Sequence, residues 1–150
     1  METLFSPEGS RQIIDRINSL KPISQNEWGT MNVSQMLVHC QQPIKVAFGD
    51  LKIKVGLLGY IFGRLGKRQL TQNNFRFKKD LPTAKEFRIS GQHDFEQSRT
   101  TLIKMIEKFS TEGPDCIANK KHPFFGTLTD EQWGSIQWKH LDHHLKQFGA

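Results

Sequence analysis

Apolar residues recur every three or four positions in four stretches of the chain, and this period predicts four amphipathic helices. The first stretch, residues 7–20, follows Ser6, a residue type that caps helix N-termini, and ends before a Lys-Pro pair. The second, residues 33–48, follows Asn32, which with a glutamine three residues later predicts a capping box. Pro43 lies inside this stretch and is expected to kink the helix or shorten it by a turn, because proline removes a backbone donor.

The other two predicted helices lie in the second half of the chain. Residues 94–109 carry an apolar stripe and are followed by a Gly-Pro stop signal. Residues 130–147 follow Thr129 as the cap, with two acidic residues in the first turn and Gln132 completing a capping box. Almost no strand pattern is present, so the chain is predicted to be all-α, a four-helix bundle.

The connection between the second and third predicted helices is long and has no sustained period. Residues 51–55 alternate apolar and basic side chains, residues 57–65 resemble a short glycine-interrupted helix, and residues 71–92 include a turn-rich Asp-Leu-Pro-Thr stretch. We therefore expect an extra short helical or irregular segment followed by a long connection. Long ordered loops often cover sites.

The chain has 150 residues, the usual size of one domain. A chain of this size needs neither a disulfide nor a metal to fold, so a metal that it holds is expected to be functional. Cys40 and Cys116 form no closely spaced motif and are interpreted as reduced thiols. The N-terminus has no signal-peptide core and the most apolar stretch is too short to span a bilayer, so a cytoplasmic location is the default.

The formal net charge is +6, which brings polyanions and anionic membranes into consideration. Basic residues are concentrated in residues 52–79, which hold no acidic residue: Lys52, Lys54, Arg64, Lys67, Arg68, Arg76, Lys78 and Lys79. Aromatic side chains are interleaved with them and offer stacking or insertion groups: Tyr60, Phe62, Phe75 and Phe77. A solvated basic surface, with these aromatics packed in the core, is the preferred interpretation.

Two histidines on the last predicted helix, His140 and His144, are one turn apart and differ by about 40° in rotation, so their imidazoles point the same way. Their face of the helix is apolar, with Trp133, Ile136, Leu141 and Phe148. The opposite face is expected to meet solvent, with Ser135, Lys139, Asp142 and Lys146. His143 lies at the border of this face and is expected either at the surface or as a neighbour that supports the metal ligands. Two buried imidazoles leave polar nitrogens in need of partners, and a bound cation satisfies them.

A two-histidine site is weak, so a third ligand is expected from another element. His39 is the one histidine on another predicted helix, and it lies at the edge of that helix's apolar face. Three neutral imidazoles suit a divalent ion such as zinc or nickel, with iron or copper as further options, and they leave positions open for water or substrate. Cys40 projects about 100° from His39 and is interpreted as a core residue with an inert thiol.

One histidine in the second predicted helix and a His-x-x-x-His pair in the last resemble the DinB/YfiT-like superfamily, specifically a largely uncharacterised branch of it. The resemblance rests on four segments: WGTMNVSQMLVH (residues 28–39), LPT (81–83), HPFFGTLTDEQW (122–133) and KHLDHHLKQFG (139–149). It implies a four-helix bundle with a divalent-metal site formed by His39, His140 and His144. Some relatives are thiol transferases that join low-molecular-weight thiols to electrophiles, and homodimers are common among such folds. Residues 51–68 are an addition relative to the plainest members.

The leading hypothesis is therefore a metal-dependent enzyme, a transferase or hydrolase acting on a small molecule, in which the ion lowers the pKa of a bound water or thiol. Residues 78–83 and His122 are expected to shape the entrance to its pocket. Two alternatives stay open. One is a binding module for nucleic acid or anionic membrane that uses residues 52–79, and the other is a bundle that holds its metal for stability alone.

Overall fold

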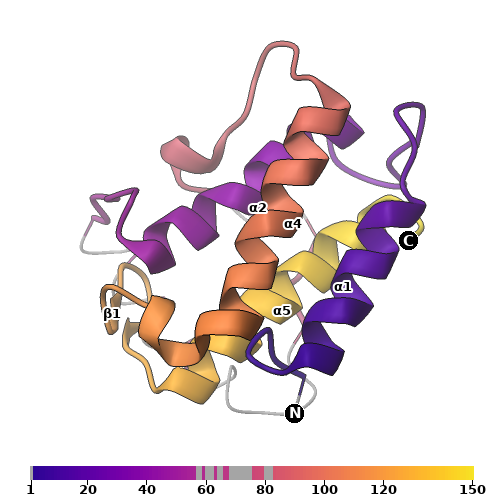
Figure 1. Cartoon of the computed structure of the whole chain (residues 1–150). Helices are drawn as coiled ribbons and strands as arrows, with labels where there is room; N and C mark the ends of the chain where they lie inside the picture. The colour runs from indigo at the N-terminus through magenta and orange to yellow at the C-terminus, as the bar shows by residue number, and fades with distance from the viewer. Residues whose placement is uncertain (1, 57–58, 60–62, 64–65, 68–75, 80–82) are drawn as a thin grey trace.

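The computed structural model describes residues 2–56, 59, 63, 66–67, 76–79 and 83–150 (Figure 1). Within these residues the chain forms four α-helices: α1 (Pro7–Ser19), α2 (Val33–Phe48), α4 (Phe95–Glu112) and α5 (Asp130–Gln147). Helices α4 and α5 each pack against both α1 and α2, so the four helices enclose a common core. The predicted all-α bundle is confirmed.

The helix starts follow the predicted capping residues. The Ser6 hydroxyl accepts a hydrogen bond from the Gly9 N–H at 3.0 Å. Both arms of the capping box are present at the start of α2, between Asn32 and Gln35, and at the start of α5, between Thr129 and Gln132. Each box satisfies backbone donors that the helix itself leaves unpaired, which fixes where the histidine-bearing helices begin.

Two helix boundaries differ from the sequence-based expectation. Helix α2 runs through Pro43 to Phe48, so the expected alternative of a shortened helix is wrong. Packing of α2 against three neighbouring elements outweighs the one backbone donor that proline removes. Helix α4 ends at Glu112, three residues later than predicted, and Gly113 then adopts a left-handed conformation with a φ of 59°.

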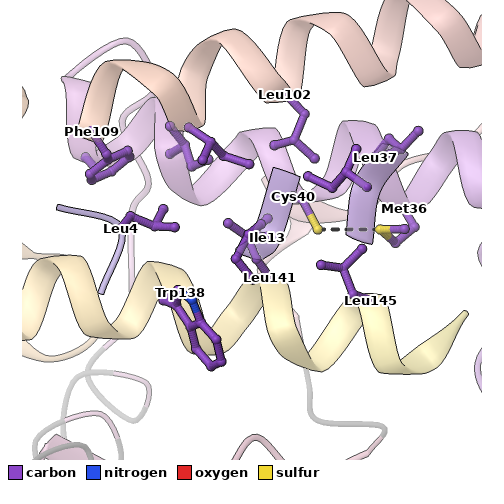
Figure 2. Packing of buried hydrophobic residues seen from close by; sticks show 14 of the residues in the cluster. Leu4, Ile13, Met36, Leu37, Cys40, Leu102, Phe109, Trp138, Leu141 and Leu145 are labelled. Atoms are coloured by element: carbon purple, nitrogen blue, oxygen red, sulfur yellow. Dashed lines mark hydrogen bonds between the residues drawn. The ribbon is translucent and has the colours of Figure 1, made fainter. Parts of the chain in front are cut away.

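The core lies between the helices and is built mostly of aliphatic side chains. Figure 2 shows Leu37 of α2 and Leu102 of α4 facing Leu141 and Leu145 of α5, with Ile13 of α1 between them. All five side chains are buried. Burying one such side chain contributes about 1.5 to 3 kcal/mol, so this layer fixes α2 and α5 side by side.

Short elements connect the helices. They comprise the 3-10 turns η1 (Lys85–Phe87) and η2 (Gly113–Cys116) and the antiparallel strands β1 (Lys121–His122) and β2 (Gly126–Thr127). The two-residue strands were not predicted, because they are too short to show an alternating pattern. Of the predicted helical segment 57–65, Gly59 and Gly63 are helical, and the other residues of that segment lie outside the described ones.

Helix α5 is buried around more of its circumference than its apolar stripe predicts. Ser135, Lys139 and Asp142, which were expected on a solvent face, are all buried, and only Lys146 of that set is exposed. The N-terminal segment explains part of this cover, since the Leu4 N–H donates to the Gly134 carbonyl at 3.2 Å. Tertiary cover of this kind leaves no trace in helical periodicity. None of the helices described here has the length and apolarity needed to cross a membrane.

Candidate metal centre

Three histidine side chains meet where α2 faces α5. His39 comes from α2, and His140 and His144 come from successive turns of α5. Their ring centroids lie 4.6 to 5.2 Å apart. One ligand nitrogen from each ring lies within 4.8 Å of the other two. The structure thus brings together the three residues that the sequence analysis selected, in an arrangement that can hold a metal ion.

Neighbouring groups fix which nitrogen of two rings faces the cluster. The Nδ1 atom of His39 lies 2.7 Å from the Phe87 carbonyl oxygen, which only accepts, so Nδ1 carries the proton. The Nδ1 atom of His144 lies 2.8 Å from Oε1 of Gln147. The Gln147 amide nitrogen donates to the Trp28 carbonyl at 2.6 Å, which leaves Oε1 as the acceptor for His144. Both rings therefore present an unprotonated Nε2, the form that binds metal.

The third ring contains a polar atom that lacks a partner. Nδ1 of His140 is buried and has no hydrogen bond to any described residue. A buried polar atom left unpaired costs about 1 to 3 kcal/mol. A metal ion ligated through this nitrogen would satisfy it. The unpaired nitrogen is therefore one reason why a metal ion suits this cluster.

Burial keeps all three imidazoles neutral. Desolvation lowers the pKa of His39 despite the hydrogen bond to Phe87, and it lowers the pKa of His144 to about 3. The pKa of His140 is held well below its usual range by desolvation and then by the neighbouring histidines. Neutral rings keep the lone pairs that a metal needs, so the cluster is ready to bind at pH 7 without first losing protons.

The separations suit a small divalent ion. Three atoms no more than 4.8 Å apart fit within a circle of radius about 2.8 Å, so each nitrogen needs to move inward by at most roughly 0.8 Å to reach a typical zinc–nitrogen distance of about 2.0 Å. Small rotations about the side-chain torsions supply such a shift. Three protein ligands leave at least one coordination position open, which is the pattern of catalytic rather than structural zinc sites.

Two rings, those of Phe77 and His143, pack against the metal ligands. Phe77 lies edge-on to His140, with centroids 5.8 Å apart, and 6.0 Å from His143. His143 packs at 5.0 Å against His144 and at 5.7 Å against Trp28. His143 is half-buried and packs on a ligand, in agreement with the expected supporting neighbour rather than the surface alternative, and it also lines a neighbouring cavity. The core-packing interpretation holds for Phe77, while Tyr60, Phe62 and Phe75 lie outside the described residues.

The cavity has a volume of about 260 Å³ and opens beside His143. Among the described residues, those that line it are Trp28, Arg76, Phe77, Lys79, Lys139, Asp142, His143 and Lys146. Of the expected entrance residues 78–83, Lys79 lies in this lining, and residues 80–82 lie outside the described ones. His122 does not line it. Instead, its ring packs 5.0 Å from Trp133, and its Nδ1 accepts hydrogen bonds from the Phe124 and Phe125 N–H groups.

The two thiols lie outside the cluster. The Cys40 thiol is buried and donates to the Met36 sulfur at 3.7 Å (Figure 2). Desolvation raises the pKa of Cys40 above its usual range and raises that of Cys116 to about 11. Neither thiol is activated, which agrees with the interpretation of Cys40 as an inert core residue.

Sequence reasoning missed the residues that orient the ligands. Phe87 contacts His39 across 48 positions, and Gln147 joins His144 to Trp28 across 119 positions. The one local signal was the spacing of Gln147, three residues after His144 and therefore on the same side of the helix.

The fold and the site define a helical bundle with a buried three-histidine cluster at a helix interface. A family model described as "Protein of unknown function (DUF1569)" matches residues 7–150, and the chain belongs to this family. No curated protein and no solved structure matches the chain.

Proposed function

We propose that the protein is a metal-dependent enzyme whose divalent ion, zinc or nickel, is held by His39, His140 and His144. The observation that carries the proposal is the convergence of three neutral imidazoles, two of them with their tautomers fixed by hydrogen bonds. Membership of the DinB/YfiT-like superfamily is part of the same proposal, and it favours transfer of a low-molecular-weight thiol to an electrophile over hydrolysis.

A role in catalysis is favoured over a purely structural role by what surrounds the cluster. A structural ion is normally enclosed by four protein ligands, whereas the described part of the chain offers three here. A cavity that shares Phe77 and His143 with the walls of the cluster gives a small molecule a place beside it. When bound, the ion lowers the pKa of a water or thiol and polarises an electrophile.

The protein's own residues orient the centre and exclude water from it. The Phe87 carbonyl and the Gln147 amide hold His39 and His144 in the metal-binding tautomer, so little reorganisation is needed on binding. Phe77 covers the side of His140 with an apolar ring. A drier site strengthens the electrostatic effect of the ion on a bound thiol.

The first test is the metal content of protein purified without chelators. His140→Ala and His144→Ala should each lose most of the bound metal, while His93→Ala should retain it, because His93 lies on the loop before α4 with its Nε2 2.9 Å from the Ser90 carbonyl oxygen. Unchanged stoichiometry in the first two variants would contradict the site.

The second test separates catalysis from a structural role. The metal-loaded protein is screened for conjugation of a panel of small thiols to an electrophile, and the screen is repeated after chelation. Metal-dependent turnover supports the proposal. If chelation lowers the melting temperature while the loaded protein shows no turnover with any thiol or hydrolysable ester, the ion is structural.

A further inference from the structure

The cavity beside the metal cluster has an excess of positive charge in its lining. Of the eight described residues that line it, four are basic, namely Arg76, Lys79, Lys139 and Lys146, and one, Asp142, is acidic. The two histidine-flanking aromatics, Trp28 and Phe77, provide the apolar part of the wall. A cavity with apolar walls and a few charged groups of one sign selects a ligand of the opposite charge.

The acidic group does not neutralise this lining. Asp142 accepts a hydrogen bond from the Arg16 guanidinium at 2.9 Å, and Arg16 itself lies outside the cavity lining. Its second carboxylate oxygen lies 2.9 Å from the Lys146 ammonium group. Arg16 already balances the negative charge of Asp142. The positive charge of Lys146 is therefore not cancelled by this carboxylate and adds to the charge of the cavity.

Lys79 is restrained by an aromatic ring of the cavity lining. Its ammonium group lies 4.1 Å above the Trp28 ring, a cation–π contact that restrains the side chain. Both Lys79 and Lys146 are exposed to solvent, so their charges are accessible to an incoming molecule. Lys139 is buried beside them, and its pKa is lowered by desolvation and by the charge of Arg76, with Glu2 opposing this effect.

The charged region and the histidine cluster are connected by four ring contacts, which involve His143 and Phe77. His143 touches both Trp28 and His144, and Phe77 touches both His143 and His140. None of the three metal ligands is among the described residues that line the cavity, so a molecule with its charged end near Lys79 and Lys146 would extend along Trp28 and pass the rings of Phe77 and His143 to reach them.

We propose that the cavity binds the anionic group, a carboxylate or phosphate, of the small molecule on which the metal centre acts, with Lys79 and Lys146 as its recognition residues. This inference rests on the proposed function for the identity of the reacting end. The recognition of an anionic group is argued from the charges of the cavity lining alone. The protein should thus prefer an anionic thiol over a neutral or cationic thiol of the same length.

The test uses three thiols that differ only in the far end: mercaptohexanoate, mercaptohexanol and aminohexanethiol. Calorimetric titration of the zinc-loaded protein should give the tightest binding for mercaptohexanoate and the weakest for aminohexanethiol. In the double variant Lys79→Gln/Lys146→Gln, affinity for mercaptohexanoate should fall about five- to tenfold, since two solvent-screened charges are lost. Mercaptohexanol should bind as before. Lys104→Gln, an exposed position on α4, is the matched control and should change nothing.

A second experiment tests anion binding in the absence of the metal. Metal-free protein is titrated with pyrophosphate, and the amide resonances of residues 142–146 are followed by NMR. Binding that disappears in the double variant supports the anion site. If the three thiols bind equally and pyrophosphate binding does not depend on the two lysines, the inference is refuted while the metal proposal stands. If no thiol binds but lysine-dependent pyrophosphate binding remains, the anion site stands and the thiol chemistry fails.

Discussion

Gln147 should control metal affinity although it is not a ligand. Its amide oxygen accepts the Nδ1–H of His144, and its amide nitrogen donates to the Trp28 carbonyl. Gln147→Met keeps the size of the side chain and removes both hydrogen bonds. His144 can then rotate, or carry its proton on the nitrogen that should bind the metal. Loss of such a supporting contact typically weakens metal binding 10- to 100-fold.

The weaker metal binding of Gln147→Met should be measurable as a lower thermal stability in the presence of the metal. At a free metal concentration of about 100 Kd, binding stabilises the native protein by about 2.7 kcal/mol. The same concentration is about 10 Kd to 1 Kd for the variant, which leaves about 1.4 to 0.4 kcal/mol. The difference of about 1.3 to 2.3 kcal/mol corresponds to a melting temperature roughly 3 to 9 °C lower for a chain of this length.

The assay compares melting temperature with and without zinc, so that stability lost by the metal-free variant is measured separately. The readout is the increment that zinc adds. Gln12→Met, at an exposed position of α1, is the control and should retain the full increment. If Gln147→Met also retains it, the Gln147 hydrogen bond does not prepare His144 for the metal, and the reasoning is refuted.

Three further changes test the fold and the site. Lowering the pH from 7 to 5 should destabilise the metal-free wild type about 2 kcal/mol more than His122→Gln in chemical denaturation, because burial holds the pKa of His122 at about 3 and the unfolded chain binds the proton first. Gly134→Ala should lower the melting temperature by an amount equivalent to about 1 to 3 kcal/mol, since a Cβ there would collide with Thr3 and Phe5. Phe77→Ala should leave metal content unchanged and reduce metal-dependent turnover, because the three ligands remain while the apolar cover of His140 and part of the cavity wall are removed.

The sequence predicted those features that depend on neighbouring residues. The pair His140 and His144 follows from one turn of helix, and the capping boxes at Asn32 and Thr129 depend on residues three positions apart. His39 required more, because only the absence of another helical histidine and the family resemblance pointed to it. Its position opposite the pair in space is a property of how α2 packs on α5.

The features that were missed depend on distant parts of the chain. The burial of Lys139 and Asp142 arises from segments that cover α5 from outside its apolar stripe, such as Arg16 of α1. Helical periodicity reports only the side facing the core, and charged residues are expected outside it. The expectation that His122 lies at the pocket entrance had the same weakness, because the hairpin that positions it was too short to recognise.

The metal cluster and the basic cavity share one structural link, and this link can be tested by itself. Gln147 bonds to His144 on one side and to the Trp28 carbonyl on the other, and Trp28 supports Lys79 in the cavity. If this chain of contacts couples the two sites, removal of Gln147 displaces Lys79 as well as His144. The losses in mercaptohexanoate affinity caused by Gln147→Met and Lys79→Gln should then fail to add in the double variant, falling short of their sum by about 0.5 kcal/mol, which is most of the loss that Lys79→Gln causes by itself. Additivity within about 0.3 kcal/mol would mean that the metal ligands and the anion site are supported independently.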